Sequence, residues 1–222
     1  MDGANLKGAR LQSANLSRAT LIEADLSGTD ISKASLRRAD MSTAKLHRAN
    51  LREADLREAN LCGADMRRAN LENADLRRAD LSEANMCWAD LSEADLSEAD
   101  FSEASLCWAD LSEARLYSTS LRNANLREAN LRKTHLSMAI LRRITTSDGV
   151  REYTDLAKID LSGVDLSDAD LAGAKVQDEQ LAQARSLRGA TMPDGRKYEE
   201  WKAEGRLNLE DEDGKSGETS AS

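Results

Sequence analysis

The sequence is poor in the residues that usually build a globular core. Aromatic residues make up only 3% of its 222 residues, and proline occurs once. Large aromatic side chains supply much of the core in ordinary globular domains, so this composition points away from that class. A bias of this kind is typical of repeat architectures.

Long apolar runs and paired cysteines are also missing. No segment approaches the roughly 18 apolar residues of a membrane helix, and the opening MDGANLKGARLQSANL lacks the apolar stretch of a signal peptide. We therefore expect a cytoplasmic protein that does not enter a membrane. Cys62, Cys87 and Cys107 include no CxxC pair, which favours reduced thiols over a disulfide framework or a metal site.

Groups suited to catalysis are scarce. The only two histidines, His47 and His135, are 88 positions apart and both fall at outward positions of the repeat described below. There is no phosphate-binding loop or dinucleotide fingerprint. The glutamates of LSEADLSEADFSEASL recur with the repeat and do not form a catalytic pair. We predict that the protein is not an enzyme and uses no cofactor or metal.

What the sequence has in abundance is a five-residue pattern. From Leu6 to Leu141, every fifth position is apolar, and 23 of these 28 positions are Leu. Ala stands two residues before each of them, except at Thr29, Thr119 and Thr134. The residue between is Asp or Asn in 19 of 28 cases, and short side chains of this kind bond to backbone groups at bends.

Neither a helix nor a straight strand can use this spacing. Five residues rotate a helix by about 500°, so successive leucines would wander around its axis. In a strand, a step of five would place alternate leucines on opposite faces. The pattern works if the chain is extended over Ala-x-Leu and bends over the next two residues. Each pentapeptide then forms one side of a closed coil.

The run ANLREADLREANLCGADMRRANLENADLRRADL resembles the pentapeptide-repeat family, whose consensus A(D/N)LXX it follows through residues 4–143. The resemblance implies an all-β solenoid, a right-handed quadrilateral β-helix of about seven coils plus a partial coil. It also implies four pentapeptides per coil. The sequence supports four by itself only through one echo, MCWAD at 86–90 and LCWAD at 106–110.

The pattern changes after residue 143. Residues 144–153 are interpreted as a loop or a degenerate repeat, with the loop favoured by the turn signal Ser147-Asp148-Gly149. Repeats resume over 154–178. Residues 179–204 are expected to form a C-terminal cap, with a short helix capped by Asp178, a turn at MPDG, and Tyr198 and Trp201 packed inside. The segment LRGATMPDG resembles the ending of bacterial pentapeptide-repeat proteins, and residues 205–222 are expected to be a disordered acidic tail.

Charge is banded along the repeat. Residues 33–78 carry 11 basic and 7 acidic side chains, residues 79–114 carry 10 acidic and none basic, and residues 115–143 carry 7 basic and one acidic. With four pentapeptides per coil, Trp88 stacks on Trp108, and glutamates stack on the other sides. Either this is a partner-contact surface or it is a solvated face left by duplication of one coil. The candidate contact residues are Trp88, Trp108, Glu83, Glu93, Glu98, Glu103 and Glu113.

Two functions remain open. The first is a non-catalytic scaffold, a rod that binds a protein partner or pairs with another copy through its uncovered N-terminal coil. The second follows from the resemblance, because some family members modulate DNA gyrase by imitating duplex DNA with an acidic rod. The neutral repeat argues against the second. Nucleic-acid binding through arginines is also disfavoured, because no aromatic residues interleave with Arg37, Arg38, Arg67, Arg68, Arg77 and Arg78.

Overall fold

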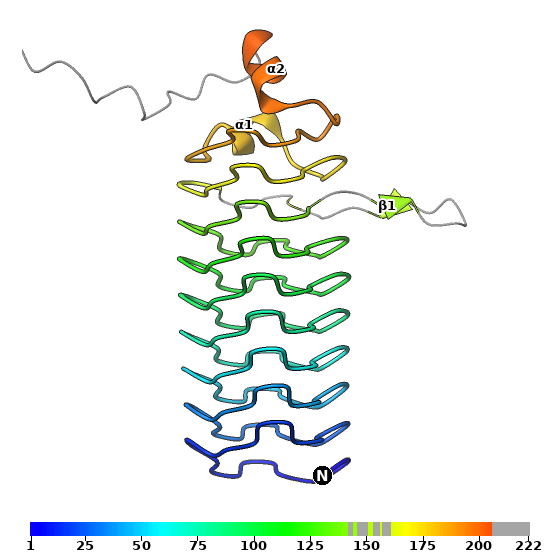
Figure 1. Cartoon of the computed structure of the whole chain (residues 1–222), viewed down its shortest axis with the longest axis vertical. Coiled ribbons are helices and arrows are strands. Elements are labelled where there is room, and N and C mark those ends of the chain that lie inside the picture. The colour runs from blue at the N-terminus through cyan, green and yellow to red at the C-terminus, as the bar shows by residue number, and fades with distance from the viewer. Residues whose placement is uncertain (142–143, 146–150, 153–155, 157–160, 206–222) are drawn as a thin grey trace, which may run out of the picture.

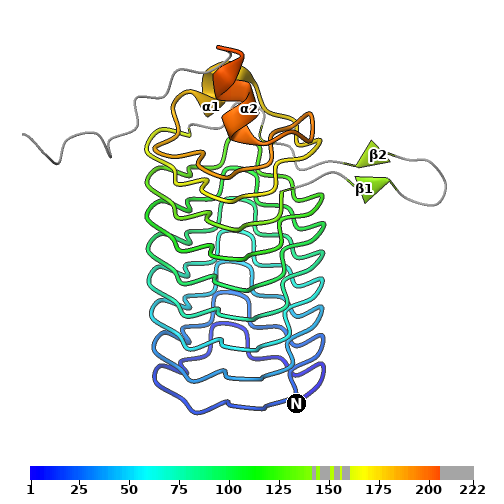
Figure 2. The same cartoon turned by 45° about the horizontal axis from the view of Figure 1, so that its top comes forward.

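The chain forms a rod of stacked coils with short helices at its C-terminal end (Figure 1). The computed structural model describes residues 1–141, 144–145, 151–152, 156 and 161–205. Seen obliquely, the coils are closed loops lying one above the next (Figure 2). The expected acidic tail falls almost entirely outside the described residues.

Parallel bridges between coils set a register of four pentapeptides, from Asn5 with Asp25 to Ser120 with Ile140. Each pentapeptide contributes the same backbone bonds to this ladder. The Leu91 N–H donates to the Asp110 carbonyl at 2.7 Å, and the Asp110 N–H donates to the Ala89 carbonyl at 2.9 Å. Residues that recur at every fourth pentapeptide therefore form columns along the rod, and each coil has four sides.

A tight turn follows every apolar residue. The Ala89 N–H donates to the Met86 carbonyl at 3.0 Å, and Trp88, third in this turn, has a positive φ of 67°. A positive φ at that position is the signature of a type II turn. The turn aims Cys87 and Trp88 outward and resets the strand for the next side. The two variable residues of each pentapeptide thus form the outer surface.

The core consists of the apolar positions of the repeat. From Leu21 to Leu141 all of these side chains are buried, and Phe101 is the largest of them. Small alanines fill the remaining interior space, in keeping with close packing. The exceptional Thr119 is buried without losing a partner, because its Oγ1 donates to the Leu96 carbonyl at 2.9 Å. Leu6, Leu11 and Leu16 of the first coil are only partly buried.

The predicted role of Asp and Asn at the bends is confirmed. Asp90 Oδ1 accepts hydrogen bonds from the Ser92 N–H at 3.0 Å and from the Ser92 hydroxyl at 2.6 Å. The same arrangement recurs at Asp80, Asp95, Asp100 and Asp110. These carboxylates hold local backbone and hydroxyl groups, so turn chemistry accounts for them.

The ladder contains ten additional residues between Leu141 and Leu156, because the Leu141 N–H donates to the Asp170 carbonyl while the Leu156 N–H keeps the usual spacing and donates to the Lys175 carbonyl. His135 pairs with Asp165 and Ile140 with Asp170, an offset of six pentapeptides instead of four. Within this stretch, strands β1 (Ile144–Thr145) and β2 (Arg151–Glu152) pair antiparallel, to the side of the stack in Figure 1. The rest of the expected loop lies outside the described residues. The register of the coils continues across the additional residues.

The C-terminal end contains helices α1 (Asp178–Leu181) and α2 (Tyr198–Ala203). The predicted N-cap was wrong by one residue. Gln177 occupies the cap position and its N–H donates to Gln180 Oε1 at 3.1 Å, so Asp178 is the first helical residue. The expected turn at 192–195 is present, closed by the Gly195 N–H on the Met192 carbonyl.

Two aromatic residues of α2 are buried as the sequence suggested. Tyr198 and Trp201 are each 3% exposed. The Trp201 indole N–H donates to Asp194 Oδ2 at 2.9 Å, and Arg196 donates to the same carboxylate through Nε and Nη2. A single carboxylate thus joins the 192–195 turn to helix α2.

The Asp194 contacts predict a dependence of stability on pH. Hydrogen bonds from Arg196 and, to a smaller extent, from Trp201 lower the pKa of Asp194 from 3.8 to about 2. Because the pKa of Asp194 is lower in the folded than in the unfolded protein, the ionised carboxylate stabilises the fold above about pH 4. This stabilisation is lost as the pH falls towards 2. We expect the melting temperature to fall over this range, and to fall less in Asp194→Asn. Asp178→Asn, which removes an exposed carboxyl on α1, is the control. Equal decreases of melting temperature over this pH range in the parent and both variants would contradict the role given to Asp194.

Candidate functional site

The two tryptophans form a stacked pair on one side of the rod. The ring centroids of Trp88 and Trp108 are 4.8 Å apart and the ring planes differ by 10°. Trp88 is 52% exposed and Trp108 is 47% exposed. The indoles cover each other on one face only, so about half of a large apolar surface remains in water. The predicted stacking of the two residues is confirmed.

Cysteine and serine side chains lie beside this pair. The Ser105 hydroxyl is 3.1 Å from the Cys87 thiol and 3.3 Å from that of Cys107. Burial raises the pKa of the Cys107 thiol, with a further contribution from Cys87. A raised pKa keeps the thiol protonated near neutrality and makes it a poor nucleophile. The Cys107 thiol is therefore not expected to act as a nucleophile beside the tryptophan pair.

The candidate glutamates do not join the tryptophans in one patch. The register places Glu83 with Glu103 on one neighbouring side and Glu93 with Glu113 on the other, while Glu98 lies on the opposite side. Together with the side of the tryptophans, these are four different faces of the rod. A flat partner surface therefore cannot contact all seven candidate residues at once.

Some of these glutamates form ion pairs with basic residues that lie outside the acidic segment 79–114. Arg78 donates to Glu98 through Nε at 2.8 Å and Nη2 at 3.2 Å, and Lys133 pairs with Glu113 at 3.0 Å. The bond from Arg78 lowers the pKa of Glu98. Glu83, Glu93 and Glu103 form no ion pair with any other residue that the structure describes. The free negative charge is smaller than the sequence count suggested.

Sequence reasoning did not place any residue other than the tryptophans in their column. Arg68 and Arg48 stand one and two coils before Trp88, and both are exposed. Neither forms a salt bridge within the described part of the chain. Extending the Cys-Trp echo back to positions 48 and 68 would have found them. The Trp surface, defined as Arg48, Arg68, Trp88 and Trp108, is cationic at one end and aromatic at the other.

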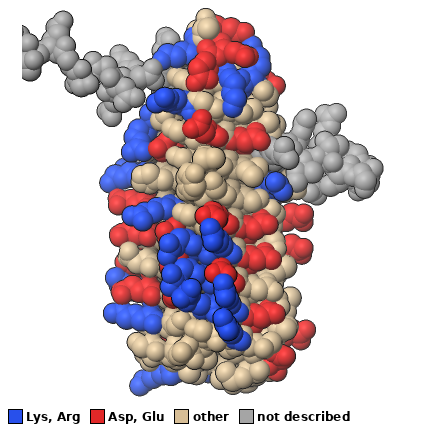
Figure 3. Space-filling view, in the orientation of Figure 1, with Lys and Arg blue, Asp and Glu red and all other residues tan. Residues whose placement is uncertain are grey.

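A second feature lies on the opposite side of the rod, two pentapeptides away in each coil. It is a groove of about 280 Å³ lined by Arg37, Arg57, Glu58, Arg77, Arg78 and Glu98. We call it the arginine groove. Figure 3 shows basic side chains gathered in the middle of one face of the rod. Arg37, Arg77 and Arg78 were considered from the sequence only as nucleic-acid contacts, and their grouping with Arg57, Glu58 and Glu98 was not predicted.

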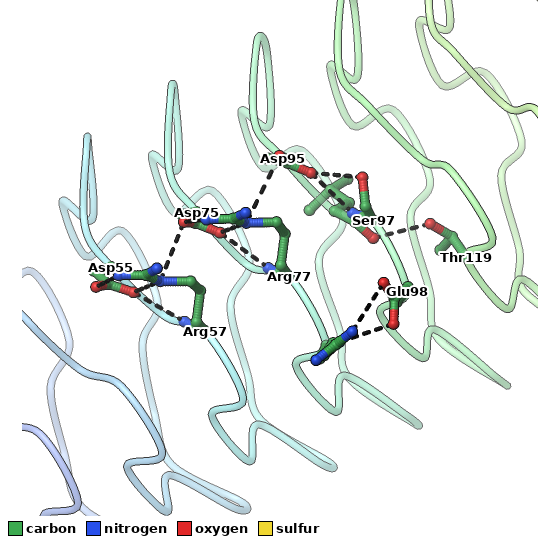
Figure 4. A network of polar contacts seen from close by, with 10 residues as sticks. Asp55, Arg57, Asp75, Arg77, Asp95, Ser97, Glu98 and Thr119 are labelled. Atoms are coloured by element: carbon green, nitrogen blue, oxygen red, sulfur yellow. Dashed lines mark hydrogen bonds and ion pairs between the residues drawn. The ribbon is translucent and has the colours of Figure 1, made fainter.

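Arg57 and Arg77 of the groove bind aspartate carboxylates that recur on successive coils (Figure 4). Arg57 contacts Asp55 through Nε at 2.8 Å and Nη2 at 2.5 Å, and its Nε lies 3.3 Å from Asp75 of the next coil. Arg77 repeats the arrangement on Asp75 and approaches Asp95 at 3.8 Å. The Arg57 bond lowers the pKa of Asp55, so both partners are charged at neutral pH.

Other kinds of site are not evident in the described part of the chain. It contains no cluster of three or more His, Cys, Asp or Glu that could hold a metal ion. None of its helices is long and apolar enough to cross a membrane. His47 lies on the side of the Trp surface and His135 on the side of the groove, so the two histidines do not meet.

Comparison with known proteins agrees with this geometry. The family model described as pentapeptide repeats matches eight copies, over residues 4–42, 44–82, 69–106, 79–116, 109–145 and 152–178. Pentapeptide repeat proteins form right-handed quadrilateral β-helices, consistent with the four-sided coils. Comparison with curated proteins gives no match.

Several solved structures are similar. HetL of Nostoc sp. strain PCC 7120, a pentapeptide repeat protein involved in heterocyst differentiation regulation, is 35% identical over 89% of this chain and 92% of its own, with a TM-score of 0.31. Another pentapeptide repeat protein from Nostoc PCC 7120 is 42% identical over 39% of this chain and 69% of its own, with a TM-score of 0.37. QnrB1, a plasmid-mediated fluoroquinolone resistance protein, is 16% identical over 94% and 97%, with a TM-score of 0.45. The repeat matches and the identity to HetL together establish that this chain belongs to the pentapeptide repeat family.

Proposed function

We propose that this protein is a non-catalytic scaffold that binds a protein partner through its Trp surface. The observation that carries the proposal is the stacked Trp88–Trp108 pair, with both indoles about half exposed. Tryptophan and arginine are the residues most enriched among those that dominate binding energy at protein interfaces. Here they share one column, and the two stacked indoles already hold each other in place, so little order of these two side chains needs to be gained on binding.

Duplication of one coil also explains why two tryptophans recur, but it does not explain why they stay exposed. Nothing in the core depends on them, because Met86 and Leu106 fill the interior of the same sides. The proposal makes no use of DNA mimicry. The glutamate columns, Glu83 with Glu103 and Glu93 with Glu113, extend over two coils each, and arginines occupy the two remaining sides.

The proposal predicts that Trp88→Ala/Trp108→Ala abolishes capture of the partner from a bacterial lysate. Both side chains are exposed, so the variant is expected to fold like the parent. Tyr117→Ala/Met138→Ala is a matched control, because these side chains are 48% and 49% exposed on the opposite side. A partner retained by the control and lost by the Trp variant supports the proposal. Identical captures by all three proteins would refute it.

We also propose that the C-terminal residues act as a cap that covers the last coil of the scaffold. With four pentapeptides per coil, residues 4–143 supply seven coils, and the segment from α1 to α2 covers the last of the resumed repeats. The buried Leu181, Leu187 and Met192 support this role, because they extend the apolar core into the cap. An open end of a β-helix would expose unpaired backbone groups. Self-association through the first coil remains a prediction.

A further inference from the structure

We propose that the arginine groove is a second protein-binding site, which takes an acidic helical segment of a partner. The proposal rests on the scaffold function, but not on the Trp surface, which lies on the opposite side of the rod. Two sites on opposite faces would allow one rod to hold two partners at the same time. The groove is therefore argued from its own contacts.

Three of the four guanidinium groups of the groove are held by hydrogen bonds, and none of the four is saturated. Arg57 and Arg77 contact their carboxylates through Nε and Nη2. Arg78 uses the same two atoms on Glu98, and Arg37 approaches Asp55 at 3.9 Å through Nε. Among the described residues, none accepts a bond from the four Nη1 groups. Four amino groups thus remain available to an incoming oxyanion, and those of Arg57, Arg77 and Arg78 belong to guanidinium groups that hydrogen bonds already orient.

The size and lining of the groove indicate side chains of a partner as the ligand. Its volume of about 280 Å³ lies near the lower limit of the roughly 300–1,000 Å³ of pockets that enclose small molecules, and it leaves room for a few side chains of a partner. The four arginines that line it are matched by Glu58, Glu98, Asp55 and Asp75, so the groove carries little net charge, and its unfilled Nη1 donors are what favour a carboxylate ligand. No aromatic side chain lines the groove for a nucleic-acid base to stack on.

The spacing of the arginines favours a helix over a strand. Arg37, Arg57 and Arg77 occupy one column, so they recur at the coil spacing of about 4.8 Å. A helix rises about 5.4 Å per turn, so side chains one turn apart stay within about 0.6 Å of this column per coil. Alternate residues of a strand are about 6.6–6.8 Å apart and lose register by about 2 Å per coil. The fitting segment is a helix with Glu or Asp at i, i+4 and i+7.

The test is binding of a fluorescein-labelled, alanine-rich peptide of about 20 residues with Glu at this spacing, a length that supports helix in water. We expect measurable binding that weakens with salt, because the contacts are between charges. Arg37→Gln/Arg77→Gln should weaken binding about tenfold or more, since two charge-assisted contacts are lost. Arg10→Gln/Arg132→Gln makes the same charge change on another side and should change binding less than about twofold.

Three further arms make the outcome decisive. Trp88→Ala/Trp108→Ala should bind the peptide normally, so failure of the Trp surface and failure of the groove are told apart. A peptide of the same composition with prolines that break the helix should bind weakly, and a single-stranded RNA of equal charge should not compete. Equal affinity of the parent and the groove variant, with both folded by circular dichroism, would overturn the proposal. So would equal binding of the broken peptide, or preferential binding of RNA.

Discussion

Phe101→Ala is expected to lower the free energy of unfolding by about 3–5 kcal/mol. Phe101 is the largest fully buried side chain among the described residues, stacked between Leu81 and Leu121 of the neighbouring coils. The ladder bonds keep the coils at a fixed spacing, so the walls of the cavity cannot collapse to fill it. Urea denaturation followed by circular dichroism measures the loss.

Phe101→Leu is the matched control for this cavity. Leu occupies 23 of the 28 apolar positions of the repeat, so the backbone accepts it at this site. We expect a cost below about 1.5 kcal/mol. Equal losses for the Ala and Leu variants would show that the size of the cavity does not determine the effect, and would contradict the close packing described for the core.

Trp201→Ala is expected to destabilise the protein by a similar amount, about 3–5 kcal/mol. The side chain is 3% exposed and its indole N–H bonds to Asp194, so both packing and a hydrogen bond are lost. Because each coil of a solenoid contacts only its neighbours, the damage should concentrate at the C-terminal end. Relative to the parent protein, amide hydrogen exchange in Trp201→Ala should accelerate more in residues 161–176 than in residues 21–100.

Trp201→Phe separates the two contributions. It retains most of the buried ring but removes the indole donor, so a loss on the order of 1 kcal/mol is expected. A Trp201→Ala loss within about 0.5 kcal/mol of the parent, the range of ordinary surface substitutions, would show that α2 does not support the rod. Exchange that accelerates uniformly along the coils would instead contradict the local role of the cap.

The sequence predicted the repeat geometry because the five-residue pattern has few physical solutions. Four pentapeptides per coil, implied by the family resemblance and supported by the echo between MCWAD at 86–90 and LCWAD at 106–110, predicted that Trp88 stacks on Trp108, and the ladder register agrees. The N-cap of α1 was placed one residue late, because an aspartate near a helix start is a common signal and Gln177 is not. Propensity alone could not choose between neighbouring polar residues.

The candidate site was only partly predictable. The exposed tryptophans follow from their turn positions, but the glutamates grouped with them lie on other faces. The arginine groove was missed because its bonds cross between coils. Arg57 reaches Asp75, and Arg78 reaches Glu98, each on the coil that follows. Counting charge along the chain averages over four sides and hides such pairs.

By itself, the sequence determined which residues point inward, since an apolar side chain at every fifth position leaves one arrangement that buries them all. It also determined that the tryptophans stay outside. Only the tertiary structure decided which outward residues become neighbours. That outcome depends on the register between coils, which the backbone hydrogen bonds set at four pentapeptides and which the additional residues after Leu141 do not disturb. The Trp surface and the arginine groove exist because that register brings together side chains that the chain itself keeps far apart.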